Sequence, residues 1–160
     1  MFRPRLQNAF PQLGPVVFAI DQENAVHYYL PRECPRVIYW KASGSSDEDV
    51  QRFFADSEAS KIIIVENNWL KRIREMTLYR YSFAEESFEL LEEAKTAGYY
   101  ISRDEITPIK TEPVDDLLGN IVAQNVELRF TPDLHRVRDR VIASTLDFSI
   151  IRFRNAQIAT

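Results

Sequence analysis

The stretch from Val16 to Trp40 constrains the fold more than any other part of this 160-residue chain. Two apolar runs, at residues 16–20 and 37–40, flank a short polar segment. Continuous apolar runs of this length are typical of buried strands. We therefore expect two strands that present the intervening polar side chains together, and these are of types that bind ligands: Asp21, His27, Tyr28, Tyr29, Arg32, Glu33, Cys34 and Arg36.

Strand and helix signals alternate through the rest of the chain. The β-branched run at residues 61–65 is the clearest central strand. We expect further strands at residues 16–20, 36–40, 77–83, 99–102, 105–110, 126–130 and 149–153. The strand at 77–83 is expected to be half-buried, because alternation puts Tyr79, Tyr81 and Phe83 on one face and Leu78, Arg80 and Ser82 on the other. Gly98 lies where a helix ends in a left-handed residue.

Helix starts follow from capping residues and proline positions. Asp21 is a good N-cap for a helix over residues 22–30, and Ser46 and Ser82 have the spacing of capping boxes. Asn67 or Asn68 is expected to cap another helix. Pro113 fits the first turn of a helix that continues to Val122 in a helical pattern, and Thr131 with Pro132 is expected to begin a last helix.

These elements predict one α+β domain over residues 1–160, with most strands in one mixed or mostly antiparallel sheet and several short helices. Residues 1–15 contain Pro4, Pro11 and Pro15, which predicts an irregular lead-in. The sequence contains no repeats and no linker rich in glycine or serine.

Composition excludes several classes of function. A net charge of −4 disfavours nonspecific nucleic-acid binding, which needs a dominant positive field. No apolar stretch approaches the roughly 18 residues that span a bilayer, so we expect a soluble, cytoplasmic protein without a membrane partner. One cysteine and two histidines are too few for a dedicated zinc or iron site, so no metal is expected.

The polar segment after residue 20 suits an anionic, aromatic ligand. Arginine binds carboxylate or phosphate through two parallel hydrogen bonds, and tyrosine adds a flat apolar face with a hydroxyl group. Arg32 and Arg36 are the candidates for holding the anion, and Tyr28 and Tyr29 for stacking or hydrogen bonding. The alternative is that the tyrosines pack in the core or its rim and Arg32 pairs with Glu33. Cys34 is interpreted as a small buried residue rather than a nucleophile.

Residues 129–154 contain six arginines against three aspartates, which suits an anionic ligand or ordinary solvated faces. Glu105 and Glu127 are the strand-borne candidates for an acid. An ion pair with Arg129, on the same face of an alternating strand, explains Glu127 equally well. The motifs of serine hydrolases, P-loop proteins, zinc proteases and dinucleotide-binding folds are absent.

Four segments carry a resemblance to a family of small uncharacterised bacterial proteins: FAIDQENAVHYYLPRECPRVIYW, TLYRYSF, GYYISRDEITP and LDFSIIRFRNA. Members usually open with a strand reading Phe-His-x-Ser-Glu before a Phe-x-Pro-Arg segment. This chain starts at Met1-Phe2-Arg3-Pro4-Arg5, in register with the second segment, so the resemblance implies that the first strand is missing.

The layout of the family resembles ADP-ribosyltransferase-like folds, such as DNA-modifying toxins and RNA 2′-phosphotransferases. That resemblance implies a cleft for NAD or ADP-ribose along Tyr28, Tyr29 and Arg32. It is a likeness of fold and assigns no chemistry by itself.

Two hypotheses remain open from the sequence. The first is a protein that binds a small anionic ligand of nucleotide type beside residues 21–36, with the residues alone identifying neither cofactor nor reaction. The second is a non-enzymatic interaction domain that forms a homodimer. Its basis is an aromatic content larger than the core of such a domain needs: Phe53, Phe54, Trp69, Tyr79, Tyr81, Tyr99 and Tyr100.

Overall fold

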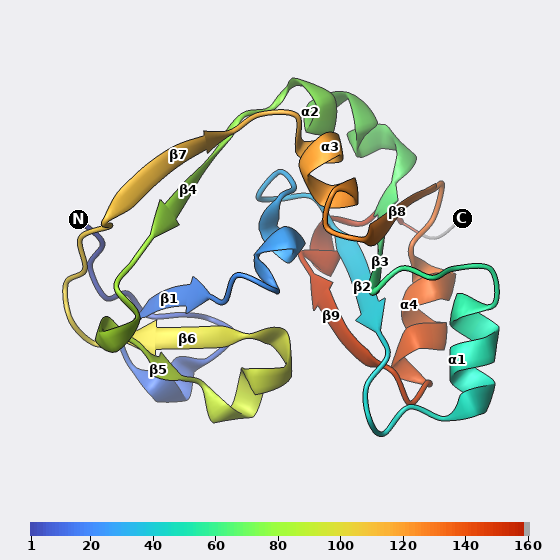
Figure 1. Cartoon of the computed structure of the whole chain (residues 1–160), viewed down its shortest axis with the longest axis horizontal. Coiled ribbons are helices and arrows are strands. Elements are labelled where there is room, and N and C mark those ends of the chain that lie inside the picture. Colours follow the sequence, from blue (N-terminus) through green and yellow to red (C-terminus); the bar gives the residue numbers. More distant parts are fainter. Residues whose placement is uncertain (159–160) are drawn as a thin grey trace. The chain divides into compact units, whose positions relative to one another are not determined.

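The computed structural model describes residues 1–158 and confirms the α+β class (Figure 1). Contacts divide the chain into two compact units. The first unit comprises Met1–Ala25 and Leu78–Val114, and the second comprises Val26–Thr77 and residues 115–158. The expectation of a single domain over residues 1–160 stays a prediction. No helix within residues 1–158 is long and apolar enough to cross a membrane.

The second unit is built on a four-stranded sheet with the order β8-β3-β2-β9. Its strands are β2 (Arg36–Trp40), β3 (Lys61–Glu66), β8 (Val126–Thr131) and β9 (Asp147–Ile151). β2 pairs antiparallel with β3 and β9, whereas β3 and β8 run parallel. The β-branched run at 61–65 is thus an interior strand, as predicted, and every residue of β3 is buried.

The two faces of this sheet carry different side chains. Val37 and Tyr39 of β2 stand opposite Ile64 and Ile62 of β3, and all four belong to one hydrophobic core. Because side chains alternate along a strand, the next residues point to the other face. That second face carries Arg36, Ile38 and Trp40 from β2 and Lys61, Ile63 and Val65 from β3.

Two helices supply the other half of this core, α1 (Asp47–Phe54) and α4 (His135–Ile142), which lie next to each other in Figure 1. α1 begins as predicted, because the Ser46 hydroxyl accepts a hydrogen bond from the Asp49 N–H at 3.2 Å. α4 begins later than predicted. Thr131 ends β8, and residues 132–134 form a bend in which the Asp133 side chain accepts a hydrogen bond from the His135 N–H at 2.9 Å.

Two short helices complete the second unit, α2 (Leu70–Glu75) and α3 (Leu117–Val122). They contact each other, and α3 also contacts β8. The prediction that Pro113 begins a helix is wrong, because Pro113 lies in a strand and Asp116 caps α3 instead. α2 follows a 3-10 turn, η3 (Asn67–Trp69), and is not capped by an asparagine side chain.

The first unit contains a three-stranded sheet and a two-stranded ribbon. The sheet has the order β1-β6-β5, from β1 (Val17–Ile20), β6 (Tyr99–Ser102) and β5 (Glu89–Leu90). The ribbon pairs β4 (Leu78–Ser82) with β7 (Lys110–Val114). The strand at 77–83 is confirmed, but β4 has no fully buried residue and Tyr79 is 62% exposed.

Three further predictions are corrected. The helix over 22–30 is only a 3-10 turn, η2 (Ala25–Tyr28), because Asp21 closes a local turn by accepting hydrogen bonds from the Asn24 N–H and side-chain amide. The helix after Ser82 is replaced by η4 (Glu85–Ser87), β5 and η5 (Glu92–Ala97), since β5 pairs with β6. Of the strand at 105–110, Ile106 forms only a single bridge with Phe2, and Lys110 begins β7. Two other 3-10 turns are η1 (Pro11–Leu13) and η6 (Phe153–Asn155).

Gly98 is the position in the first unit that tolerates substitution least. Its φ of +71° is left-handed, as predicted, and an added Cβ would collide with the carboxylate of Asp21 and the amide of Asn24. We expect Gly98→Ala to lower the free energy of unfolding by more than about 1 kcal/mol. The measurement is urea denaturation. Gly44→Ala is the matched control, because an added Cβ there meets nothing within 4 Å. Equal losses in the two variants would contradict the expectation.

Candidate functional site

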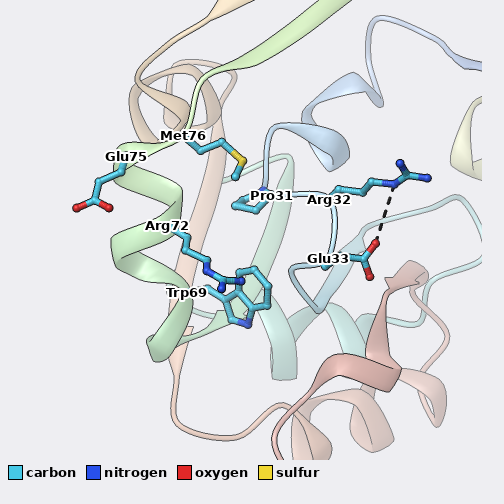
Figure 2. Close-up of a pocket in the computed structure, with 7 residues that line it drawn as sticks. All are labelled: Pro31, Arg32, Glu33, Trp69, Arg72, Glu75 and Met76. Atoms are coloured by element: carbon cyan, nitrogen blue, oxygen red, sulfur yellow. Dashed lines mark ion pairs between the residues drawn. The ribbon is translucent and has the colours of Figure 1, made fainter.

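A pocket of about 360 Å³ lies in the second unit beside the loop that joins η2 to β2. Its lining comes from that loop, from η3 and from α2: Pro31, Arg32, Glu33, Trp69, Arg72, Glu75 and Met76 (Figure 2). Most of the lining surface is apolar, and the charged groups are side chains with large solvent exposure. Residues 31–33 of the lining belong to the stretch that the sequence analysis identified. The other lining residues come from positions 69–76.

Arg36 fixes the loop that carries the pocket. Its side chain is 1% exposed, and one of its terminal nitrogens donates hydrogen bonds to the carbonyl oxygens of Cys34 at 2.8 Å and Pro31 at 3.3 Å. The Cys34 N–H also donates to the Pro31 oxygen at 2.9 Å. A guanidinium that binds two carbonyl groups of a short loop holds that loop against the sheet, so Arg36 is in contact with the protein rather than exposed in the pocket.

Trp69 and Arg72 form the aromatic wall of the pocket. They lie one helical turn apart, and the Arg72 guanidinium carbon is 5.1 Å from the centre of the indole ring. Figure 2 shows this pair below Pro31 in the view, whereas Arg32 and Glu33 project to its right. The pocket therefore has an aromatic part and a charged part.

The charged part is centred on Glu33. Three arginines approach its carboxylate: Arg32 at 4.0 Å, Arg152 at 3.7 Å and Arg154 at 3.7 Å. The Asn155 side-chain amide donates to the Glu33 carboxylate at 2.9 Å and to its backbone carbonyl at 2.8 Å. The hydrogen bond from Asn155, aided by the arginines, holds the pKa of Glu33 below its ordinary value. Glu33 is thus a carboxylate whose charged form is favoured by three neighbouring cations.

The other predicted binding residues are placed as follows. Tyr28 is 39% exposed, and its ring lies 5.4 Å from the Arg36 guanidinium carbon, while Tyr29 is buried. Cys34 is fully buried, and burial raises its pKa to about 12, so the thiol is uncharged at neutral pH. This agrees with the interpretation of Cys34 as a small buried residue. Of the four predicted ligand-binding residues, Tyr28, Tyr29, Arg32 and Arg36, Arg32 is the one that lines the pocket.

The two candidate acids lie away from this pocket's lining. Glu105 belongs to the first unit, where it is exposed and paired with Arg3 at 3.0 Å. Glu127 lies on the face of the sheet opposite Arg36, the same face as Tyr39, and pairs with Arg129. The hydrogen bond from Arg129 lowers the pKa of Glu127. The structure thus contains the internal ion pair that the sequence offered as the alternative for this residue.

The second face of the sheet contains a buried polar pair that sequence reasoning missed. Lys61 is 5% exposed, and its ammonium nitrogen lies 3.0 Å from Nε2 of the fully buried His27. It also lies 4.8 Å from the centre of the Trp40 ring. An ammonium group only donates, so His27 Nε2 accepts and the ring proton is assigned to Nδ1. Nδ1 has no hydrogen-bond partner among residues 1–158. The position of Lys61 at the start of a continuous β-branched run was the available signal.

Glu66 is a second buried group that the sequence did not point out. It ends β3 and is fully buried. One carboxylate oxygen accepts a hydrogen bond from the Gln157 N–H at 2.9 Å, and the other has no partner among residues 1–158. Its place at the end of a continuous apolar strand, directly before Asn67, Asn68 and Trp69, was its only sequence signal.

A second depression of about 580 Å³ lies where β8 leads into α4. Arg136 and Arg140 line it one helical turn apart, together with Thr131, Pro132, Asp133 and Val137. Asp133 accepts hydrogen bonds from the backbone and ring of His135, which lower its pKa. Five of the six arginines of residues 129–154 are therefore distributed between this depression, the Glu33 cluster and the ion pair with Glu127, and Arg138 pairs with Asp139 at 2.7 Å.

The burial of His27 predicts a specific pH dependence. Desolvation, followed by the charges of Lys61 and Arg36, lowers the pKa of His27 from 6.5 to about 3. Between pH 6.5 and about 3, His27 is therefore protonated in the unfolded chain but neutral in the folded chain. Stability is complete above about pH 6.5 and falls by up to about 1.4 kcal/mol per pH unit below it, until the folded pKa is reached.

Urea denaturation at a series of pH values from about 7 to about 5 measures this slope. In that range the carboxylates with lowered pKa values remain ionised. We expect His27→Gln to lose most of the slope. A slope that is the same in His27→Gln and the unchanged protein would contradict the assignment.

Comparison with known families gives one match. A comparison with curated proteins and another with solved structures each found no match. The matched family covers residues 1–156, which is nearly the whole chain. The chain therefore belongs to the family described as "Family of unknown function (DUF6886)".

Proposed function

We propose that this chain binds a small anionic ligand of nucleotide type in the pocket beside Pro31. The observation that carries the proposal is the presence, in the lining of one pocket, of the aromatic wall formed by Trp69 and Arg72 and of the guanidinium of Arg32. The ring of the ligand lies against Trp69 and Arg72, and its phosphate lies toward Arg32. Both parts are needed, since neither a tryptophan nor surface arginines alone select such a ligand.

The aromatic wall supports a planar ring as the apolar part. Stacking of a base on an aromatic side chain contributes about 1–3 kcal/mol. Arg72 adds a flat cationic plane over the indole, and a guanidinium also stacks on rings. Met76 and Pro31 supply adaptable and rigid apolar contacts at the edge of the same pocket.

Charge supports a phosphate as the anionic part. Arg32, Arg152 and Arg154 carry three positive charges, and Glu33 carries one negative charge, which leaves a net charge of +2. A phosphate monoester carries about −1.5 to −2 at neutral pH, so it matches this excess. Arginine is also the residue that binds phosphate through two parallel hydrogen bonds.

The size of the pocket supports a ligand with one base. Ligand pockets range over about 300–1,000 Å³, and 360 Å³ is at the lower end of that range. A mononucleotide or the ADP part of ADP-ribose suits this volume better than a whole dinucleotide. The resemblance to ADP-ribosyltransferase-like proteins makes ADP-ribose and NAD the first ligands to compare. Tyr28, Tyr29 and Arg36 then act by shaping and holding the loop, and the catalytic candidates Glu105 and Glu127 stay predictions.

Calorimetric titration with AMP, ADP, ADP-ribose and NAD tests this proposal. We expect binding of at least one of them, weakened roughly tenfold by Arg32→Ala because a charged hydrogen bond is lost. Trp69→Ala is expected to weaken it by roughly tenfold or more, through the loss of stacking.

Arg74→Ala is the matched control, because Arg74 is an exposed arginine of α2 that does not line the pocket. Two results would contradict the proposal. One is the absence of binding by all four compounds. The other is an equal effect of the Arg32, Trp69 and Arg74 substitutions, which would place the binding elsewhere.

A second candidate function is a homodimer that forms through the ribbon of the first unit. The observation that favours it is the exposure of two tyrosines on one face of β4, Tyr79 at 62% and Tyr81 at 43%. A two-stranded ribbon is only marginally stable by itself, and partner strands or helices stabilise such ribbons. Tyrosine is also enriched in protein interfaces.

Light scattering coupled to size-exclusion chromatography tests the homodimer. We expect a mass of two chains at high protein concentration, and a shift to one chain when Tyr79 and Tyr81 are both changed to serine. Circular dichroism of the variant verifies that it is folded. A mass of one chain for the unchanged protein at high concentration would rule this candidate out.

A further inference from the structure

The chain from the end of η6 onward contacts two carboxylates of the second unit. We define residues 154–157 as the strap. Arg154 and Asn155 contact Glu33, with the amide of Asn155 at 2.9 Å from the carboxylate. Two residues later the Gln157 N–H donates to the buried carboxylate of Glu66 at 2.9 Å. The strap is therefore attached at two points, and both points are acids.

The strap is attached by polar contacts rather than by burial. Arg154, Asn155 and Gln157 are exposed, and no residue of the strap is fully buried. The residue before it behaves differently, because the Phe153 ring packs against the core of the second unit and lies 4.3 Å from the guanidinium carbon of Arg138. Phe153 is thus a fixed anchor, and the strap beyond it depends on Glu33 and Glu66. Exposed ion pairs of this kind are weak and are screened by salt.

The group beneath the strap is unusual in its hydrogen bonding. Glu66 is fully buried, yet its second carboxylate oxygen has no hydrogen-bond partner within residues 1–158. Burial of an acceptor without a partner is unfavourable, so such groups in folded proteins call for an explanation. The explanation that we consider is that this oxygen of Glu66 accepts a hydrogen bond from a ligand.

We propose that the strap is a cover over Glu66 that a bound phosphate opens. The proposal rests on the proposed function, because it assigns a regulation to the same site. A phosphate beside Arg32 competes with the Glu33 carboxylate for Arg154 and Arg152. Once Arg154 and Asn155 leave Glu33, the Gln157 N–H leaves Glu66. The carboxylate of Glu66 then accepts a hydrogen bond from an O–H or N–H group of the ligand.

The first test needs no ligand. Glu33→Gln removes the charge that attracts Arg154 but leaves an oxygen of the same shape. We expect hydrogen exchange of the Gln157 backbone N–H, measured by NMR, to become at least tenfold faster. We also expect Glu66 to become reactive toward a carbodiimide, read by mass spectrometry. Glu75→Gln is the matched control, because Glu75 lines the pocket but has no contact with the strap.

An unchanged exchange rate of the Gln157 N–H in Glu33→Gln would overturn the proposal, whatever the result of the nucleotide titrations. An equal acceleration in Glu75→Gln would overturn it too, since the effect would then be a general loss of stability. Faster exchange and labelling of Glu66 in Glu33→Gln alone would support it.

The second test uses inorganic pyrophosphate on the unchanged protein, with sodium chloride at equal ionic strength as the reference. We expect pyrophosphate, but not the salt, to accelerate exchange of the Gln157 N–H at least threefold. No acceleration would overturn the opening by phosphate. Acceleration by pyrophosphate together with no binding of any nucleotide would support the strap and contradict the proposed function, so the two failures are distinguishable.

Discussion

The position of the pocket depends on the hydrogen bonds from the Arg36 guanidinium to the loop before β2. Arg36 is the first residue of an interior strand, and its partners in β3 and β9 fix where the side chain begins. The guanidinium then fixes where the loop lies, through the carbonyl groups of Pro31 and Cys34. A charge that is 1% exposed is costly to bury, and hydrogen bonds to the two carbonyl groups offset part of that cost. The same hydrogen bonds therefore stabilise the charge and place Arg32 and Glu33 at the surface.

The two glutamates near the loop show how environment divides the roles of one residue type. Glu33 is exposed and gathers cations, so its charge is compensated several times. Glu66 is buried at the end of β3 with a single backbone N–H as its hydrogen-bond donor. Glu33 is thus suited to competition with a dissolved anion, and Glu66 to a directed hydrogen bond. The strap, residues 154–157, contacts both glutamates. It therefore connects a charged group at the surface with a carboxylate in the interior.

Local signals in the sequence were sufficient for elements whose partners lie close by or whose pattern is strong. The β-branched run of β3, the Ser46 cap of α1 and the left-handed Gly98 were all predicted, because each depends on the residue itself and its immediate neighbours. The helix expected after Ser82 failed for the opposite reason. Its apolar residues follow a helical spacing, but pairing of β5 with β6 uses the same backbone groups.

The site was predictable only in part for a similar reason. The loop with Arg32 was visible as a cluster of polar residues between two apolar runs. Arg36 is also an arginine and lies four positions after Arg32, yet the pairing of β2 with β3 places its side chain in the interior. Trp69 and Arg72 lie more than thirty residues after Pro31 in the sequence, so only the tertiary fold brings the three residues together. The partnership of Glu66 with Gln157 spans 91 positions and left no local trace.

Charge distribution decides how a ligand would be recognised by this protein. The chain as a whole has a net charge of −4, so its long-range field does not attract anions. Screening at physiological salt limits exposed charges to a range of about 8 Å. Only arginines within that range of the pocket matter, and three of them surround Glu33. The proposed recognition of an anion therefore depends on contact geometry at the loop rather than on steering from a distance, which favours discrimination between anions by shape. The aromatic wall of Trp69 and Arg72 is the feature that provides such a shape.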